Sequence, residues 1–221
     1  MLIRFAIMRQ QLNRYIFGLL CAFCLMACSD GSEDDNGEDL PPYISDLVVL
    51  SLDADGRFAT VKLDDGSTYD IRSQQLMSEV KDTLLRCLAT YTLVQGKMQV
   101  YGMQRVFCSR PMWADSIRVS VNGEVHIGHQ YLPRDPMNVV SLWKSGGYVN
   151  MHLTLMTTGK GIHQYAFCED SVGHYSLLHS RPKDDAESYK EHIYLSMPIP
   201  NGVEHLTFSV HTYDSIYTRD F

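Results

Sequence analysis

The chain has 221 residues, 45% of them apolar, so it is long enough and hydrophobic enough to form a globular protein with a buried core. It holds 19 Lys and Arg against 26 Asp and Glu. The first 27 residues contain three arginines and no acid, which leaves 16 basic and 26 acidic side chains in the remaining 194 residues, a formal charge of −10. This balance argues against nucleic acid or anionic lipid headgroups as the main partner.

The N-terminus has the pattern of a bacterial lipoprotein signal. Arg9 and Arg14 precede an uncharged run over 15–27, about 13 residues long, shorter than the ~20 residues that a membrane-spanning helix needs. The run ends in the lipobox Leu25-Met26-Ala27-Cys28. We therefore expect cleavage after Ala27 and a diacylglycerol on the Cys28 thiol, since acyl chains hold a protein on a bilayer without a spanning helix. An ordinary secretory signal with a coincidental cysteine is the alternative.

Residues 28–42 are predicted to be a disordered tether. Positions 29–42 contain six acids and no basic residue, and such a segment repels itself and cannot form a core. In some bacterial lipoproteins an acidic run after the lipidated cysteine is also a signal for export to the surface, whereas a plain solvated linker explains the same residues. The expected location is the outer membrane, at its periplasmic face or at the cell surface.

Residues 43–110 are predicted to form a small OB-like barrel. Strands are expected at 46–52, 58–63 and 69–71, with Asp64-Asp65-Gly66-Ser67 as a hairpin turn. Two longer strands follow at 85–94 and 98–107, and Gly102 marks a bulge in the second. Between the two groups of strands, a short helix is predicted at 74–83, because Leu76 and Val80 are four residues apart. Five strands and one helix suit a partly open barrel.

Alternation in the 85–94 strand predicts which side chains face the barrel core. Cys87, Ala89, Tyr91 and Leu93 fall on one face, and Arg86 falls on the opposite face with two threonines and a leucine. The pattern therefore assigns Tyr91 to the core and Arg86 to the outside.

Residues 111–221 are predicted to form a β-sandwich, after a linker at 108–115. Two hairpins are expected, at 117–127 around Asn122-Gly123 and at 139–156 around Ser145-Gly146-Gly147. Further strands are expected at 162–168, 174–179, 192–197 and 206–213. Short strands at this spacing with almost no helix are typical of a sandwich, so the fold class is all-β.

Three cysteines remain beyond the lipobox: Cys87, Cys108 and Cys168. An odd number leaves at least one free thiol in an oxidising compartment. Cys87 and Cys108 can pair if their strands are neighbours, and the favoured alternative is that all three are small buried hydrophobic residues.

Several segments resemble the NigD-like lipoproteins, a family named for a member encoded beside the bacteriocin nigrescin. The resemblance rests on "YISDLVVLSLDADGRFATVKLDDGSTYDI", "RCLATYTLVQGKMQVYGMQRV" and "DPMNVVSLWKSGGYVNMHLTLMTTGKGIHQYAF". Residues 63–66 and 146–148 are its most specific points. It implies an N-terminal OB-like domain, a C-terminal β-sandwich and a lipidated N-terminus, and it implies no catalytic activity.

Three groups of residues invite a chemical interpretation, and each has a simpler one. His126 and His129 have an H-x-x-H spacing, but residues three apart on a strand face opposite ways, so partly exposed histidines are expected. Asp53, Asp55 and Gly56 resemble part of a calcium loop and are expected to be a turn. The third group is a set of carboxylates that could bind a cation or act on a glycan and is expected to be a solvated loop: Asp184, Asp185, Glu187 and Glu191.

Aromatic residues are the remaining candidates for a ligand site. Trp113, Trp143 and Tyr148 flank turns, and their expected role is packing between sheets; if Trp143 and Tyr148 are exposed near Gly146-Gly147, they face a ligand. Tyr101 is a possible stacking platform on the barrel. Residues 43–110 hold eight basic and eight acidic side chains, so we expect a glycan or peptide ligand rather than nucleic acid.

Three functions follow as hypotheses. The first is a non-enzymatic binding or accessory lipoprotein of the cell envelope, without cofactor or metal and with an unknown envelope protein, peptide or glycan as partner. The second is a partner in immunity to, or secretion of, a bacteriocin. The third is a glycan-active or metal-dependent hydrolase that uses the 184–191 carboxylates or the 126–129 histidines; the sequence contains no Gly-x-Ser-x-Gly or P-loop motif to support an enzyme.

Overall fold

A computed structural model describes residues 42–72, 75–77, 80–121 and 124–221. These residues form strands joined by turns, with two single-turn 3₁₀ helices, η1 (Ala114–Ser116) and η2 (His129–Tyr131), so the predicted all-β class is confirmed. No helix in the described part of the chain is long and apolar enough to span a membrane. Ala27, Cys28 and all of the tether up to residue 41 lie outside the described residues.

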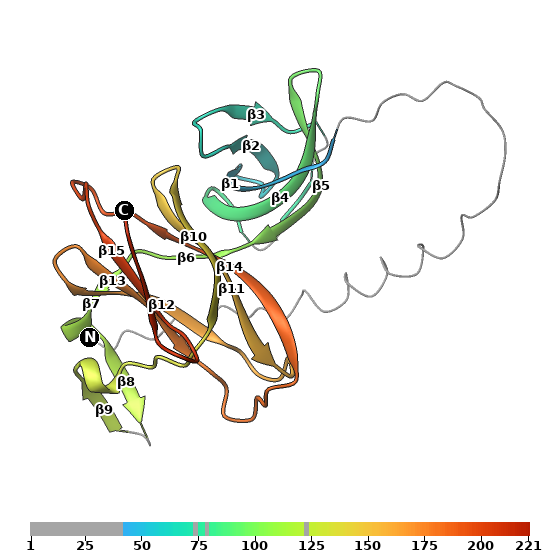
Figure 1. Cartoon of the computed structure of the whole chain (residues 1–221). Coiled ribbons are helices and arrows are strands. Elements are labelled where there is room, and N and C mark those ends of the chain that lie inside the picture. Colours follow the sequence, from blue (N-terminus) through green and yellow to red (C-terminus); the bar gives the residue numbers. More distant parts are fainter. Residues whose placement is uncertain (1–41, 73–74, 78–79, 122–123) are drawn as a thin grey trace. The chain divides into compact units, whose positions relative to one another are not determined.

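Five strands form a curled sheet with the order β3-β2-β1-β4-β5 (Figure 1). They are β1 (Ile44–Leu52), β2 (Phe58–Lys62), β3 (Thr68–Asp70), β4 (Leu84–Val94) and β5 (Lys97–Arg105). Beyond β3, a parallel bridge joins Ile71 to Met98, and the N–H of Arg72 donates to the carbonyl of Met98 at 2.9 Å. This contact brings the two edge strands together and closes the sheet into the expected barrel.

The core of the barrel follows the predicted alternation in β4 for three of four residues. Cys87, Ala89 and Tyr91 are buried, but Leu93 is 37% exposed because it lies next to the β4–β5 turn, beyond the core. The bulge in β5 is also confirmed. Thr90 pairs with Gly102 and Tyr91 pairs with Val100, so Tyr101 is the extra residue.

The predicted helix at 74–83 is wrong. Its described residues, 75–77 and 80–83, are not helical, and Leu76 forms an isolated bridge with Arg57. The N–H of Met77 donates to Gly56 O at 2.8 Å, and Met77 and Val80 pack against the barrel core. The spacing of apolar residues therefore reflects an irregular segment bound along the start of β2 and not one face of a helix.

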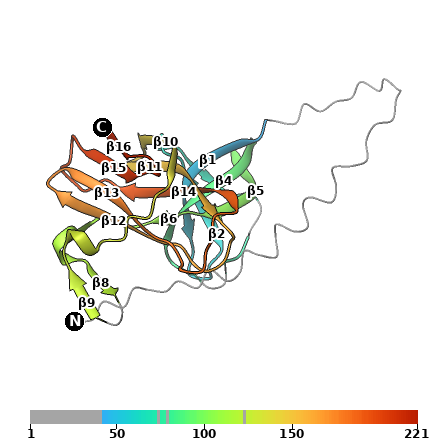
Figure 2. The same ribbon diagram turned by 60° about the horizontal axis from the view of Figure 1, so that its bottom comes forward.

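Two further sheets pack face to face as a sandwich (Figures 1 and 2). The first has the order β10-β11-β14-β6 and the second β16-β15-β13-β12-β7. Their strands are β6 (Phe107–Cys108), β7 (Met112–Trp113), β10 (Asn138–Ser145), β11 (Tyr148–Thr157), β12 (Gln164–Ser171), β13 (His174–Ser180), β14 (Tyr189–Pro198), β15 (Thr207–His211) and β16 (Ile216–Asp220). Side chains from both sheets fill the core, among them Met151, Leu153, Leu195, Phe167 and Phe208.

Two features of the sandwich differ from the sequence-based expectation. The predicted linker at 108–115 contains β7 and the end of β6, which add a parallel edge strand to β12 and to β14 respectively. The last strand, β16, was not predicted, and it pairs with β15 at the other edge. The chain between the barrel and the sandwich thus contributes one strand to each sheet of the sandwich and is not an unstructured linker.

A smaller apolar cluster covers the outer side of β12 and β13. Ala114 and Ile117 pack there with Leu132, Cys168 and Leu178. From this cluster the hairpin of β8 (Arg118–Val121) and β9 (Glu124–Ile127) projects from the sandwich in both views (Figures 1 and 2). This hairpin and the β10–β11 hairpin both agree with the sequence prediction.

The three cysteines of the described region are all free. Cys87 and Cys168 are buried in two different apolar clusters, and Cys108 is half-buried. The interpretation of these residues as small buried hydrophobic side chains therefore holds for Cys87 and Cys168, and the alternative pairing of Cys87 with Cys108 is not formed.

Candidate functional site

The two most specific points of the NigD-like resemblance, residues 63–66 and 146–148, meet in space. The turn after β2 places Asp64 against the β10–β11 turn, where Ser145 Oγ donates to Asp64 Oδ2 at 2.6 Å across 81 residues of sequence. Gly146 has a φ of +58°, and a Cβ on it would lie 2.3 Å from Asp64 Oδ1. Only glycine fits at this position, both because of its backbone conformation and because of the approach of Asp64.

Arg86 on β4 completes this contact from inside the protein. Its side chain is 1% exposed, and its Nη1 and Nη2 donate to the two carboxylate oxygens of Asp64 at 2.6 and 2.7 Å. Nη2 also donates to Asn150 Oδ1 at 3.1 Å, and Nε donates to Ser196 Oγ at 3.3 Å. The guanidinium carbon lies 4.2 Å from the centre of the Tyr148 ring. All three guanidinium nitrogens therefore have partners, as a buried charge requires.

The sandwich supplies the other half of these bonds. Asn150 and Ser196 lie opposite each other on β11 and β14, and Ser196 Oγ donates to Asn150 Oδ1 at 2.7 Å. Asn150 Nδ2 in turn donates to Ser145 Oγ at 2.8 Å. We call these five residues (Asp64, Arg86, Ser145, Asn150 and Ser196) the junction network. The hydrogen bonds of this network join the barrel to the sandwich, and its polar groups are one another's hydrogen-bond partners.

The electrostatics of the junction network favour a charged pair. Burial alone would raise the pKa of Asp64, but the hydrogen bonds from Arg86 and Ser145 outweigh this effect and hold the pKa below its ordinary value of 3.8. Burial raises the pKa of the Tyr148 phenol, which stays neutral beside the guanidinium. Asp64 is thus a carboxylate bound to Arg86 and is not a free acid or base.

A cavity of about 360 Å³ lies beside the junction network. Because the carboxylate of Asp64 is already bound to Arg86, the cavity offers a ligand mainly the remaining polar groups and aliphatic surface of its wall. Its lining residues are Val49, Lys62, Leu63, Asp64, Asp65, Gly66, Leu84, Gly146 and Tyr148.

A row of imidazole and aromatic side chains continues along the same outer face of the sheet. His152 lies opposite Ser141 on β10 and Tyr194 on β14. It is two residues along β11 from Asn150, which lies opposite Trp143, so both pairs are on the same face. His152 stacks on Tyr194 at 4.4 Å between ring centres, and its Nε2 lies 2.8 Å from Nδ1 of His192. Burial and the neighbouring His192 lower the pKa of His152, which favours the neutral form of the His152 ring.

The three predicted ligand-facing aromatics have different surroundings. Tyr148 lies under the guanidinium of Arg86, and Trp143 is half-buried beside Asn150 on the outer face of the sheet. Tyr101 is on the barrel, 49% exposed, with its ring 4.8 Å from that of Tyr43. Contact of any of them with a ligand stays a prediction.

The predicted histidine and aspartate patterns lie apart from the junction network. His126 stacks on Tyr131 at 4.4 Å, while His129 on η2 lies 3.6 Å from Asp170. Across the described residues no group of three or more His, Cys, Asp or Glu side chains could hold a metal ion. Asp53 Oδ1 accepts from the N–H groups of Asp55 and Arg57, which is the bonding of the expected turn.

The carboxylates at 184–191 require a correction. Asp185 is not part of a solvated loop: it is buried, and its Oδ1 accepts from both the N–H and the hydroxyl of Thr158 at 2.7 Å. Glu187 is more exposed and pairs with Arg181 at 3.1 Å. Charge and polarity alone suggested a surface loop, whereas hydrogen bonds from a distant strand end stabilise Asp185 in the interior.

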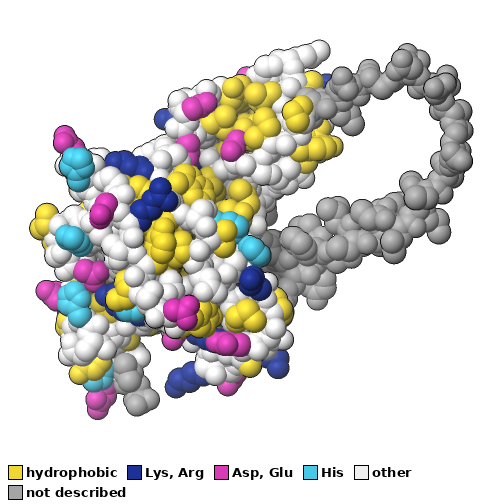
Figure 3. Space-filling view, in the orientation of Figure 1, with side chains coloured by type: hydrophobic (Ala, Val, Ile, Leu, Met, Phe, Trp, Pro, Cys, Tyr) yellow, Lys and Arg dark blue, Asp and Glu magenta, His cyan; other side chains and the backbone are white. Residues whose placement is uncertain are grey.

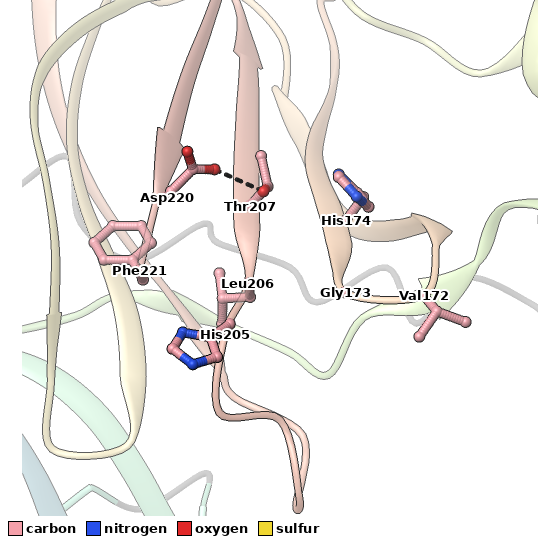
Figure 4. Close-up of a pocket in the computed structure, with 8 residues that line it drawn as sticks. All are labelled: Val172, Gly173, His174, His205, Leu206, Thr207, Asp220 and Phe221. Carbon is pink, nitrogen blue, oxygen red and sulfur yellow. Dashed lines mark hydrogen bonds between the residues drawn. The ribbon is translucent and has the colours of Figure 1, made fainter.

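A second cavity, of about 440 Å³, lies near the C-terminus between Val172 and Phe221 (Figure 4). Asp220 Oδ1 accepts from the Thr207 hydroxyl at 2.7 Å, and the imidazoles of His174 and His205 point away from one another. The side chains drawn in Figure 4 therefore do not converge on a common point, as the groups of a catalytic or metal site do.

Comparison with solved structures finds this fold in other proteins. A NigD-like immunity protein of Bacteroides caccae ATCC 43185 is 24% identical, with a TM-score of 0.60, and the match covers 82% of this chain and 93% of that one. A proposed toxin-related protein of Parabacteroides distasonis ATCC 8503 is 12% identical, with a TM-score of 0.61 and coverage of 81% and 92%. A proposed lipoprotein of Bacteroides fragilis NCTC 9343 is 9% identical, with a TM-score of 0.53 and coverage of 82% and 96%.

No family model matches the chain, and no curated protein sequence matches it. At the identities of the three structures, the likeness establishes a shared fold. The resemblance to NigD-like proteins that the sequence suggested is thus confirmed as a likeness of fold over four-fifths of the chain.

The residue that sequence reasoning missed is Arg86. Alternation placed it on the outer face of β4, which is correct, but that face is covered by the sandwich. The available signal was the pair of segments at 63–66 and 146–148, which marked both sides of the junction network without identifying the cation between them.

Two neighbouring glycines allow the junction to be tested. Gly146→Ala should destabilise the protein more than Gly147→Ala, because both positions have positive φ but only the Cβ at 146 collides with Asp64; a Cβ at 147 meets nothing within 4 Å. We expect about 1 kcal/mol for the backbone conformation in Gly147→Ala and at least ~2 kcal/mol more in Gly146→Ala, measured by urea unfolding. Equal losses in the two variants would contradict the contact between the turns.

Proposed function

We propose that this protein is a lipid-anchored component of the bacterial cell envelope that binds a partner and catalyses no reaction. The anchor is the diacylglycerol on Cys28, and the acidic residues up to position 42 separate the lipid from the folded part. The likeness of the fold to a proposed lipoprotein and to an immunity protein supports this function.

The observation that carries the proposal is the saturation of the junction network. Arg86 and Asp64 form a two-point ion pair, with nitrogen–oxygen distances of 2.6 and 2.7 Å, and each is the main partner of the other. An enzyme needs polar groups directed at substrate, with hydrogen-bonding capacity to spare. Here these groups join two parts of one protein and leave the surfaces of the barrel and the sandwich for binding.

The charge distribution on the surface fits a protein, peptide or glycan partner. On the face drawn in Figure 3, acidic, basic and histidine side chains are interspersed with hydrophobic ones. A nucleic-acid partner would call for a clustered basic face, and the formal charge of the chain is −7. The half-buried Trp143 and the stacked His152 and Tyr194 offer planar surfaces of the kind that sugars and peptides contact.

The hydrolase hypothesis has weaker support. Asp185, its main carboxylate, is bound to Thr158 and buried, and His126 and His129 have different neighbours. Among the solved structures that share the fold are an immunity protein, a proposed toxin-related protein and a proposed lipoprotein.

The lipid anchor is tested by metabolic labelling with radioactive palmitate. The parent chain should be labelled and should sediment with membranes, whereas Cys28→Ser should lose the label because it removes the sulfur that is acylated. Cys108→Ser is the matched control: Cys108 is half-buried and free, so its loss should leave labelling unchanged. Undiminished label in Cys28→Ser rules out the proposed anchor.

A bacteriocin immunity role is the second candidate function, favoured by the likeness to the immunity protein of Bacteroides caccae. If it is correct, cells lacking this chain should become sensitive to the cognate toxin, and expression of the parent chain should restore resistance. Killing curves that do not change with the gene deleted would leave the general binding role and remove this one.

A further inference from the structure

Three loops at one end of the sandwich are joined by a line of hydrogen bonds through two histidines. His163 precedes β12, His179 lies on β13, and Asp185 follows β13. His163 Nε2 lies 3.0 Å from Asp185 Oδ2, and His163 Nδ1 lies 2.9 Å from His179 Nε2. At the far end, His179 Nδ1 lies 3.0 Å from the backbone carbonyl of Asp135.

This line is sheltered from water. The side chain of Asp185 is 0% exposed and that of His163 is 11% exposed, and His179 is 3% exposed. The two imidazole planes are within 18° of each other, so the rings meet edge to edge in the Nδ1–Nε2 contact. Water has little access to replace a missing hydrogen bond here, and the hydrogens of the rings can be counted against the acceptors.

Both ends of the line are acceptors. The carbonyl of Asp135 cannot donate. Burial would raise the pKa of Asp185, but the hydroxyl and N–H of Thr158 more than offset it and hold the pKa well below its ordinary value, so this carboxylate is ionised and also cannot donate. Each outer ring nitrogen must therefore carry a hydrogen, and the inner contact between the rings needs a third. Two neutral imidazoles carry only two.

A neutral pair leaves one contact without a hydrogen. If the missing hydrogen is that of His163 Nε2, a nitrogen lone pair faces the Asp185 carboxylate at 3.0 Å. The hydroxyl of Thr157 is the other group near that nitrogen, at 3.4 Å, a poor distance for an O–H donor. If the inner hydrogen is missing, two nitrogen lone pairs face each other at 2.9 Å. If the missing hydrogen is that of His179 Nδ1, a nitrogen lone pair faces the carbonyl oxygen of Asp135 at 3.0 Å.

The charges around the pair favour an added proton. Asp185 faces His163 directly, and Arg181 Nε lies 3.5 Å from the same carboxylate. Arg181 is also bound to Glu187, and the Asp135 carboxylate accepts from the backbone N–H of Arg181 at 2.7 Å. The Arg181 guanidinium is thus shared between two carboxylates, with a third carboxylate at its backbone, and the cluster can accommodate a second cation. The remaining groups near the cluster are Tyr165, stacked on His179, Glu191 beside Tyr165, Tyr213 near Arg181, and Arg134, whose guanidinium is bound to Asp170.

We propose that the folded protein binds one proton between these loops at neutral pH, with His163 as an imidazolium that donates to Asp185 and to a neutral His179. Burial and the charge on His163 lower the pKa of His179, which agrees with this assignment. The proton thereby links the loop at 158–163 to the loop that carries Asp185. The two loops are in close contact, since Gly161 has no room for a Cβ against Pro182.

The exposed pair of His152 and His192 needs fewer hydrogens than the buried pair. Their nitrogens are also 2.8 Å apart, but within the described residues no hydrogen bond to an acceptor is found at the other end of either ring, so one hydrogen satisfies the contact. Two histidine pairs with similar nitrogen separations therefore need different numbers of hydrogens, because only the buried one lies between a carboxylate and a carbonyl.

Binding of this proton makes the stability of the folded state depend on pH. An exposed imidazole titrates near pH 6.5, so at pH 7.5 the unfolded chain holds fewer protons at these positions than the folded protein. A folded state that binds more protons than the unfolded state loses stability as the pH rises. We expect the bonds that close these loops, including Thr158 N–H to Asp185, to open more often at pH 9 than at pH 7.

The direct test is NMR of the imidazole nitrogens in the ¹⁵N-labelled full chain in detergent micelles at pH 7.5. His163 should show both nitrogens protonated and His179 should show a hydrogen on Nδ1 only. One hydrogen on His163 would overturn the proposal.

Two variants test the source of the charge by the same measurement. Asp185→Asn should return His163 to a single hydrogen, since the ionised acceptor is gone, and Asp184→Asn, which changes the exposed neighbour, should leave both hydrogens in place. Retention of both hydrogens in Asp185→Asn overturns the role of the carboxylate. If Asp185→Asn does not fold, the spectrum of the parent chain still decides the protonation of His163.

Discussion

The structure depends on one buried ion pair, between Arg86 of the barrel and Asp64 of the turn after β2. An arginine side chain that is 1% exposed cannot be left without acceptors, and here the two oxygens of Asp64, Asn150 and Ser196 satisfy it. Removing one partner of such a pair typically costs about 3–5 kcal/mol, because the other charge is left uncompensated. The pair therefore determines how the barrel meets the sandwich more than it adds to the net stability.

Several local features follow from this constraint. Gly146 has to be glycine because Asp64 must approach the β10–β11 turn closely enough to reach Ser145. Asn150 and Ser196 are buried polar residues, whereas the residues next to them on β11 and β14, which point to the other face of the sheet, are apolar. The two polar side chains are buried there because their partner is a cation from another part of the chain. Further along the same face, where the junction network ends, His152 and Tyr194 take over as partly exposed side chains.

Local patterns predicted most of the strands, and long-range contacts account for the errors. Hairpins at Asp64–Ser67 and Ser145–Gly147 and the core face of β4 at Cys87, Ala89 and Tyr91 could be read from turn residues and alternation. The burial of Arg86 could not be predicted, because alternation shows that its side chain points away from the barrel core but not that the sandwich covers that face. Asp185 was missed for the same reason, since its partner Thr158 is 27 residues away. The helix expected at 74–83 failed because a spacing of four also arises in an irregular segment held by Arg57 and Gly56.

The central claim is that the junction network, with the Arg86–Asp64 pair at its centre, makes barrel and sandwich one cooperative unit, because Arg86 donates to Asn150 and Ser196 and Asp64 accepts from Ser145. Differential scanning calorimetry tests this claim most directly. We predict a single unfolding transition for the parent protein and two separated transitions for Arg86→Met, which keeps the bulk of the side chain and removes the charge. Arg72→Met, at an exposed position whose guanidinium donates to Gln99 at 3.4 Å, should unfold like the parent. A single transition at the parental temperature in Arg86→Met would contradict the account.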